Sequence, residues 1–275
     1  MHAGRWDKSA VGSHEVRGRR LGIVGYGNIG SQLSVLAEAL GMSVLFFDTA
    51  DKLALGNARR CGTLDELLAE SDVVSLHVDG RVSNSSFFGD EQFARMRAGS
   101  VFLNLSRGFV VDHAALRRHI ESGHLTGAAV DVFPVEPKTP GEEFVSELRG
   151  LKNVILTPHV GGSTEEAQQD IGHFVAGKLR DFVHDGGTSL SVNLPPVSLP
   201  RAGGPRLLHL HINTPGVIAT VTALLADHGI NLEGQLLSTR GSLGYVVTDI
   251  AATDLSDLTG ALLAMPETVR LRVLP

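Results

Sequence analysis

Residues 21–30 read LGIVGYGNIG, and this stretch decides the fold. Its first four residues form an apolar run typical of a buried strand, and from Asn28 apolar residues recur at helical spacing as far as a stop at Gly41. Between strand and helix lies a G-x-G-x-x-G pattern made by Gly25, Gly27 and Gly30. A glycine turn in this context predicts the binding of a dinucleotide.

Each glycine of the turn has its own physical task. Gly25 permits a tight turn, Gly27 lets the backbone approach a pyrophosphate, and Gly30 lets the helix pack closely on the strand. The helix N-terminus then offers free N–H groups and the positive end of its dipole to the phosphates. Asp48 ends the next predicted strand, where a carboxylate accepts from both ribose hydroxyls and repels a 2′-phosphate. We therefore expect NAD rather than NADP, although Lys52 lies nearby.

Short apolar runs alternate with amphipathic segments up to residue 158, which predicts a parallel sheet with helices on both faces. After the turn strand, further strands are expected over residues 43–48, 72–78, 101–105, 128–133 and 154–157. Helices are expected from Thr63, from near Asp90 and from Asp112. The fold class is thus α/β, of the doubly wound Rossmann type.

The remainder of the chain changes in composition and rhythm. A capping box at Ser163–Glu166 opens a long helix to about Val183, and a Gly/Ser/Pro-rich linker follows it. After the linker, the order β-α-β-β-α-β predicts a small ferredoxin-like sandwich. We expect a nucleotide-binding domain at 1–162, a return helix and linker at 163–202, and the sandwich at 203–275.

Composition excludes several classes of protein. The net charge of −6 argues against a sequence-independent grip on nucleic acid. No apolar run reaches the length of a membrane span, and the N-terminus does not resemble a secretory signal. A single cysteine, Cys61, excludes an intramolecular disulfide framework and a C-x-x-C metal or redox motif, and no H-E-x-x-H motif occurs. We expect a cytoplasmic protein without a metal.

Three polar residues stand just past the ends of three different predicted strands, namely Arg107, Glu136 and His159. In open α/β sheets, ligands bind beyond the carboxyl ends of the strands. Imidazole can take a hydroxyl proton near neutrality, a neighbouring carboxylate orients it, and a guanidinium holds a carboxylate through paired hydrogen bonds. Taken singly each residue is commonplace, but the combination predicts hydride transfer from a hydroxy acid, with His159 as the acid/base, Glu136 as its partner and Arg107 as the carboxylate clamp.

Asp131 lies inside an apolar predicted strand, and a buried carboxylate needs hydrogen-bond donors. Two sources of donors are open at this stage. One is the carboxamide of a bound nicotinamide, and the other is neighbouring backbone.

Several stretches together resemble the D-2-hydroxyacid dehydrogenase family, and within it the phosphoglycerate dehydrogenases with one C-terminal ACT domain. They are residues 17–30, 75–78 (SLHV), 104–108 (NLSRG), 130–133 (VDVF) with 136–137 (EP), and 157–164 (TPHVGGST). The resemblance implies NAD-dependent oxidation of 3-phospho-D-glycerate to 3-phosphohydroxypyruvate, the opening step of serine synthesis. It also implies feedback by L-serine and a homotetramer.

The resemblance places the catalytic set on the same three residues as the strand-end argument. It implies cofactor contacts at Asn28, Ile29, Asp48, Leu105, Ser106, Arg107, Asp131, His159, Gly161 and Gly162, and effector contacts at His211, Asn213 and Asn231. For the effector residues, a role as polar loop caps is the alternative. Trp6 and Lys8 resemble a segment that in the family reaches a neighbouring subunit's site.

The family carries a further N-terminal lobe that supplies most of the substrate domain, and we expect this chain to lack it. Two alternatives therefore stand beside the dehydrogenase reading. The first alternative is a catalytically incomplete fragment that binds NAD and serine. The second is a dehydrogenase for another 2-hydroxy acid.

Overall fold

The computed structural model describes residues 2, 4, 6, 8–139, 141–251 and 254–275. The chain divides into two compact units, Met1–Thr164 and Glu165–Pro275. By this division the long helix α5 (Glu165–Asp185) and the linker after it belong to the second unit. Within the described residues, no helix is long and apolar enough to cross a membrane.

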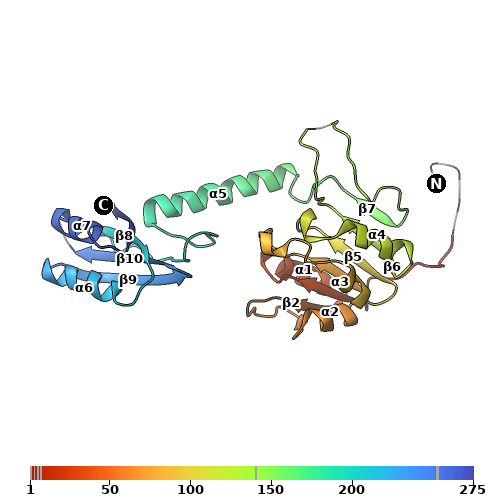
Figure 1. The fold of residues 1–275 in the computed structure, drawn as a ribbon, viewed down its shortest axis with the longest axis horizontal. Helices are drawn as coiled ribbons and strands as arrows, with labels where there is room; N and C mark the ends of the chain where they lie inside the picture. Colours follow the sequence, from red (N-terminus) through yellow and green to blue (C-terminus); the bar gives the residue numbers. More distant parts are fainter. Residues whose placement is uncertain (1, 3, 5, 7, 140, 252–253) are drawn as a thin grey trace. The chain divides into compact units, whose positions relative to one another are not determined.

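The first unit is built on a seven-stranded parallel sheet with the order β3-β2-β1-β4-β5-β6-β7 (Figure 1). The strands are β1 (Arg20–Val24), β2 (Ser43–Phe47), β3 (Arg59–Arg60), β4 (Val73–Leu76), β5 (Ser100–Asn104), β6 (Leu125–Val130) and β7 (Val154–Leu156). The order reverses between β1 and β4, and the glycine turn follows β1. The crevice for a ligand therefore opens at this point of reversal.

Helices pack on both faces of this sheet, as the apolar strands require. They are α1 (Asn28–Ala39), α2 (Leu64–Glu70), α3 (Asp90–Arg95) and α4 (His113–Glu121). On one face α1 packs over Ile23 and Phe46, and on the other α2, α3 and α4 enclose a larger cluster around Phe93 and Phe102. Because successive strand residues point to opposite faces, two core layers form on one sheet. The doubly wound α/β prediction is confirmed.

One strand was not predicted. Strand β3 is only two residues long, and both are exposed arginines. Its pairing with β2 carries no apolar pattern, so nothing in the local sequence distinguishes it from a loop.

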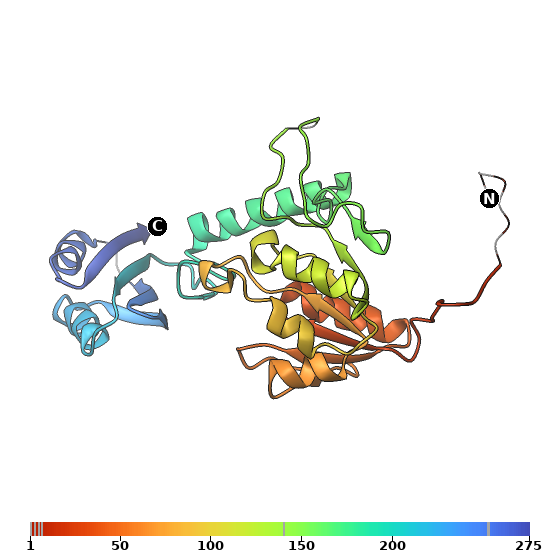
Figure 2. The same ribbon diagram turned by 45° about the vertical axis from the view of Figure 1, so that its right-hand side comes forward.

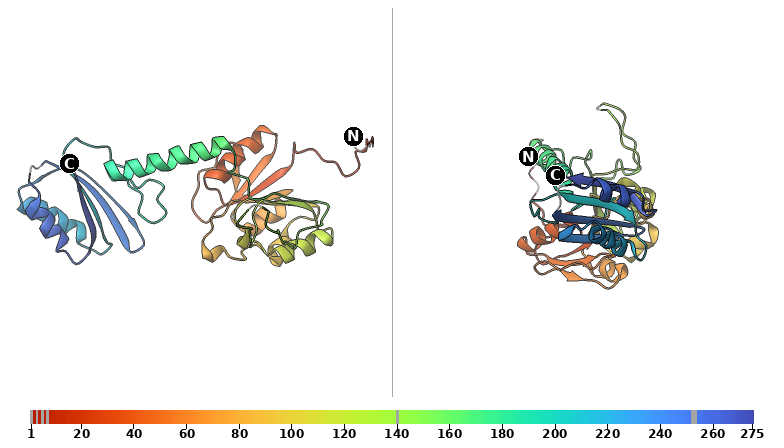
Figure 3. Two further views of the ribbon diagram at one scale, coloured as in Figure 1. Left: turned by 90° about the horizontal axis from the view of Figure 1, so that it is seen from above. Right: turned by 90° about the vertical axis from the view of Figure 1, so that its left-hand side faces the viewer.

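The second unit ends in a four-stranded antiparallel sheet with the order β11-β8-β10-β9. Its strands are β8 (Arg206–Ile212), β9 (Asn231–Arg240), β10 (Leu243–Ala251) and β11 (Thr268–Leu274), and its helices are α6 (Val217–Asp227) and α7 (Ser256–Leu263). Both helices lie on one face of this sheet (Figure 3). The expected β-α-β-β-α-β order is confirmed, although α6 begins after Pro215, because Gly216 takes a left-handed conformation at the N-cap.

A buried arginine ties the sheet to the end of α5. Arg206 is fully buried and its guanidinium donates two hydrogen bonds to Asp249, at 2.5 and 2.7 Å. Its remaining N–H groups donate to the carbonyls of Asp185, Leu199 and Pro200. A buried charge is tolerated when it is paired and every donor is satisfied, which is the case here.

The second unit also buries His209, which is 2% exposed and hydrogen bonded through Nε2 to Thr268 Oγ1 at 2.8 Å. Burial, with a smaller effect of nearby His211, lowers the pKa of His209 from 6.5 to about 4. The unfolded chain therefore binds a proton at this position at a higher pH than the folded chain. The stability of the second unit should fall as the pH drops from 6.5 toward 4.

Between pH 7 and pH 4.5, the free energy of unfolding of His209→Gln should fall by about 2–3 kcal/mol less than that of the wild type, because glutamine does not titrate. Urea unfolding followed at pH 7 and at pH 4.5 measures it. His228→Gln, a change at an exposed histidine, should leave the pH dependence as it is. An equal loss in His209→Gln and the wild type would show that His209 is not the titrating group.

Candidate functional site

The glycine turn after β1 is shaped by three different steric demands. Gly25 has φ of +93°, and a methyl group on it would lie 2.7 Å from the backbone carbon of His77. A methyl group on Gly30 would lie 2.3 Å from the carbonyl oxygen of Gly25. A methyl group on Gly27, by contrast, has no atom within 4 Å. Two glycines are therefore required by the fold, and the third lines open space.

That open space faces the start of helix α1. Gly27 is the N-cap and makes no side-chain cap, so no side chain of the cap covers the first N–H groups, near Asn28 and the exposed Ile29. Free N–H groups at a helix N-terminus suit a phosphate. The turn thus has the form of a pyrophosphate cradle, and its residues fit NAD.

Asp48 follows β2 and is bonded to the turn. Its Oδ2 accepts a hydrogen bond from Tyr26 N and its Oδ1 one from Ala50 N, both at 2.8 Å. A carboxylate oxygen has more than one acceptor position, so Asp48 keeps capacity for ribose hydroxyls. Arg60 donates to the Asp48 carbonyl and pairs with Asp51.

Tyr26 was not singled out by the sequence, yet it fixes the turn. Its ring stacks on Phe46 with centroids 3.8 Å apart, and its hydroxyl is 2.7 Å from Ser34 Oγ. An aromatic residue in the second position of the pattern, followed eight residues later by serine on the helix, was the available signal.

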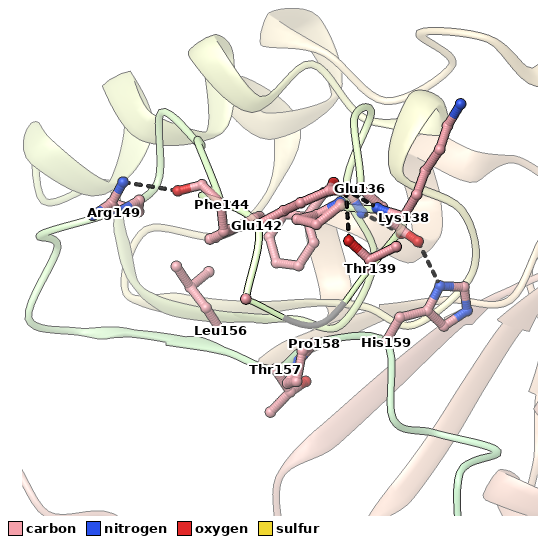
Figure 4. A pocket seen from close by; sticks show the side chains of 13 residues that line it. Glu136, Lys138, Thr139, Glu142, Phe144, Arg149, Leu156, Thr157, Pro158 and His159 are labelled. Atoms are coloured by element: carbon pink, nitrogen blue, oxygen red, sulfur yellow. Dashed lines mark hydrogen bonds and ion pairs between the residues drawn. The ribbon is translucent and has the colours of Figure 1, made fainter.

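His159 and Glu136 meet at the carboxyl edge of the sheet. His159 Nδ1 lies 2.9 Å from Glu136 Oε2, and both side chains are partly exposed (Figure 4). A carboxylate accepts, so Nδ1 carries the proton and the lone pair of Nε2 is left for another group. Burial favours a raised pKa for Glu136, but the hydrogen bond from His159, with that from Phe133 N, outweighs it and lowers the pKa below 4.5. Glu136 is thus charged beside the imidazole.

The backbone at His159 is strained, with φ of +54°. A left-handed conformation is uncommon outside glycine and persists only where surrounding contacts impose it. Those contacts come from Asp131, whose carboxylate accepts from Thr157 Oγ1 at 2.6 Å, Val160 N at 2.9 Å and Gly161 N at 3.1 Å. Burial favours a raised pKa for Asp131, but these bonds outweigh it and lower the pKa.

Two sources of donors for Asp131 were considered above, and the structure shows that neighbouring backbone N–H groups donate to its carboxylate. Asp131 holds the turn that carries His159, and Thr157 is a partner that the sequence did not reveal. A threonine directly before Pro158-His159 was the only available signal.

Arg107 stands apart from the other two residues of the predicted set. Its Nη1 donates to the Ser106 carbonyl at 2.7 Å, and among the described residues no hydrogen bond or ion pair joins it to Glu136 or His159. Its backbone is held by buried Asn104, which donates to the Arg107 carbonyl and accepts from Ser106 N and Oγ. Leu105, between them, is exposed.

A cavity of about 640 Å³ lies beside the His159–Glu136 pair. Phe133, Phe144 and Leu156 give it an apolar wall, and Lys138 and Arg149 are also among its lining residues (Figure 4). Most of this wall comes from the long connection between β6 and β7, which projects from the unit (Figure 2).

The three predicted effector residues do not meet within one chain. His211 is buried on β8 opposite Gly244, whereas Asn231 opens β9 opposite Ala251, seven residues farther along β10. Seven residues of strand span about 23 Å. Asn213 lies near His211, donating from its backbone to Ser242 and from Nδ2 to Gly241. His211 Nδ1 donates to the Ile212 carbonyl, and its buried Nε2 has no hydrogen-bond partner among the residues that the structure describes.

The glycine geometry makes a paired prediction about dinucleotide binding. Gly27→Ala should weaken NADH binding at least about tenfold with little change in the unfolding midpoint, because the methyl group fills only the space for the phosphates. Gly30→Ala should lower both the affinity for NADH and the unfolding midpoint, because its methyl group meets the Gly25 carbonyl. Fluorescence titration with NADH and thermal unfolding separate the two effects, and equal destabilisation by both changes would contradict the assignment of Gly27 to the cradle.

Comparison with known proteins agrees with this geometry. The family described as D-isomer specific 2-hydroxyacid dehydrogenase, NAD binding domain, matches residues 1–161, and an AHAS small subunit-like ACT domain matches residues 207–270. D-3-phosphoglycerate dehydrogenase of Haemophilus influenzae is 50% identical over 275 residues, which cover 100% of this chain and 67% of that protein. The enzyme named D-3-phosphoglycerate dehydrogenase 1 of Saccharomyces cerevisiae is 45% identical over 94% of this chain and 57% of its own length.

Solved structures show the same likeness in the fold. The D-lactate dehydrogenase of Aquifex aeolicus, complexed with NAD and lactic acid, is 30% identical with a TM-score of 0.57, covering 66% of this chain and 58% of that one. A glyoxylate reductase from Paecilomyes thermophila is 32% identical with a TM-score of 0.55, covering 63% of this chain and 52% of that one. The chain belongs to the D-isomer specific 2-hydroxyacid dehydrogenase family, and its first unit is that family's NAD-binding domain with an ACT domain in the second.

Proposed function

We propose that the protein oxidises 3-phospho-D-glycerate to 3-phosphohydroxypyruvate with NAD. The observation that supports this most directly is the contact between His159 Nδ1 and Glu136 Oε2, at the sheet edge where the glycine turn also lies. Identity of 45–50% to proteins named D-3-phosphoglycerate dehydrogenase supports this substrate over other hydroxy acids.

In this proposal the chain's residues handle the proton and the orientation. Bound NAD supplies the acceptor for the hydride that leaves the carbinol carbon. His159 Nε2 takes the hydroxyl proton, since Nδ1 is already engaged with Glu136. The carboxylate of Glu136 stabilises the imidazolium that results, and Asp131 keeps the ring in place through its bonds to the turn.

Arg107 is proposed to hold the substrate carboxylate. Guanidinium forms two parallel hydrogen bonds with a carboxylate and so aims the carbon that reacts. Within the described part of the chain, its guanidinium makes one hydrogen bond, to the Ser106 carbonyl, which leaves further donors for a ligand.

Replacement of the histidine tests the catalytic assignment. We expect His159→Ala to lower turnover about 10²–10⁴-fold, because proton transfer loses its acceptor, while NADH binding stays near the wild-type value. His173→Ala, at an exposed histidine of α5, serves as the matched control. Near-normal turnover in His159→Ala would reject the assignment.

Two other functions remain as outcomes of the same assays. A dehydrogenase for another hydroxy acid is favoured by the likeness to the lactate and glyoxylate enzymes, and a substrate panel distinguishes it. A catalytically incomplete fragment would bind NADH without turnover, and activity of this chain by itself would reject that view.

For the second unit we propose feedback by L-serine at a site shared by two copies of the chain. The separation of Asn231 from His211 along the sheet supports a shared site, because one copy cannot offer both to a small ligand. Strands β9 and β11 form the two edges of the sheet and leave backbone groups for pairing. Pairing through these edges is in keeping with the proposed homotetramer.

Complementation between variants tests the shared site. His211→Ala and Asn231→Ala should each abolish serine binding in calorimetry, because each removes one half of every site. Mixed assemblies of the two variants should regain binding, because one of the two sites then has both residues intact. Absence of serine binding by the wild type would remove the feedback proposal. If the mixed assemblies do not regain binding, the site is not shared between two copies in the way proposed.

A further inference from the structure

The loop of residues 79–84, called the Asp79 loop below, follows β4 at the carboxyl edge of the sheet. It ends in a short 3-10 helix at Val82–Asn84. It joins the same edge as the glycine turn, since Gly25 packs against the backbone of His77 just before it. None of the functions proposed above uses its residues.

The carboxylate of Asp79 organises this loop. It accepts hydrogen bonds from Arg81 Nε at 2.9 Å, from Arg81 Nη2, and from Asn84 Nδ2 at 2.9 Å. Asn84 Nδ2 also donates to the Asp79 carbonyl. These bonds join Asp79 to Arg81 and to Asn84, and Gly80 lies between the first two. The conformation of Gly80, between Asp79 and Arg81, is therefore set by its neighbours.

Gly80 lies against the side chain of Arg107. A methyl group on Gly80 would be 3.2 Å from Cγ, 3.4 Å from Nε and 3.6 Å from Cδ of Arg107. The contact with Cγ is tighter than an ordinary van der Waals contact, so the arginine would have to shift by a few tenths of an ångström, whereas the contacts with Nε and Cδ are ordinary. The absence of a side chain at Gly80 thus makes the room that the Arg107 stem occupies.

The backbone of Arg107 has no matching freedom to move away. Asn104 Nδ2 donates a hydrogen bond to its carbonyl, as described above. Gly108, the next residue, packs against the backbone of Phe133 in the connection after β6, since a methyl group on it would lie 1.9 Å from the carbonyl carbon of Phe133. A methyl group on Gly80 would therefore meet the flexible side chain of Arg107 and not its backbone.

We propose that the Asp79 loop positions Arg107, with Gly80 as the residue that sets where its guanidinium stands. Gly80 is a positioning residue in this scheme, because it acts on a ligand only through Arg107.

The charges of the loop support this assignment. The hydrogen bond to Asp79, and more weakly the charges of Asp79 and Asp48, raise the pKa of Arg81. Arg81 is thus committed to Asp79, while Arg107 is paired with no carboxylate among the residues that the structure describes. Arg81 is thus engaged within the loop, and Arg107 is left as the guanidinium that can bind an anion.

Two variants and one control test the proposal. Gly80→Ala adds the methyl group that meets Arg107, and the backbone at Gly80 is not left-handed, so alanine suits its conformation. Asp79→Asn keeps the shape of the side chain but removes the charge that binds Arg81, and it serves if Gly80→Ala does not fold. Val82→Ala changes an 88% exposed residue of the same loop and is the control.

The first readout does not depend on activity. Modification of Arg107 by phenylglyoxal, followed by peptide mass spectrometry, should change in rate in Gly80→Ala and Asp79→Asn and stay unchanged in Val82→Ala. The same rate in all four proteins would overturn the proposal, whatever their activity.

The second readout rests on the proposed function, in which Arg107 binds the substrate carboxylate. In Gly80→Ala we expect KM for the hydroxy acid to rise about tenfold, with little change in NADH affinity or in the pH dependence of kcat. In an Arg107→Lys background the same change should add little, because the group that it positions is gone. A full additional loss in that background would also count against the proposal.

The two hypotheses fail in different ways. If the wild type binds no NADH and turns over no hydroxy acid while the phenylglyoxal rates still respond, the proposed function falls and the positioning role stands. If the wild type is active and the rates do not respond, the positioning role falls alone.

Discussion

The close approach of Gly30 to the Gly25 carbonyl is the constraint on which the first unit depends. With no side chain at either position, helix α1 begins directly against the end of β1, and the backbone of the β4 end can close on the same turn. This contact places free helix N–H groups beside the switch in strand order. The residues of the other strand ends then surround one crevice, because parallel strands end at the same edge.

Around that crevice, each candidate group is held by polar atoms of its own chain. Asp131 fixes the turn of His159, Glu136 fixes its ring, and Asn104 fixes the backbone before Arg107. Asp131 and Asn104 are short side chains at strand ends, where few rotatable bonds separate them from the sheet, and Glu136 lies in the connection between β6 and β7. A site built this way is organised before a ligand arrives, which is what efficient transfer of a hydride and a proton requires.

The second unit uses a different solution for a similar problem. Its sheet is joined to the end of α5 by the fully bonded guanidinium of Arg206. Its candidate effector residues, however, lie far apart along the sheet, because His211 on β8 faces one end of β10 and Asn231 on β9 faces the other end. One copy therefore cannot bring all of these residues to a single small ligand.

The sequence by itself determined the parallel sheet, the glycine turn and the chemical types at the strand ends, because hydrophobic period, turn chemistry and the succession of elements along the chain can be read locally. It did not reveal β3, whose two arginines carry no pattern, or the supports provided by Tyr26, Asn104 and Thr157. Those roles depend on contacts between residues far apart in the chain, such as Asp131 with Thr157. The partnership of Glu136 with His159 was predicted from the sequence, and the structure places the two side chains in contact. Only the tertiary structure decided that Asp131 holds the turn of His159 and that Arg107 packs against Gly80, because such partners follow from packing and not from spacing in the sequence.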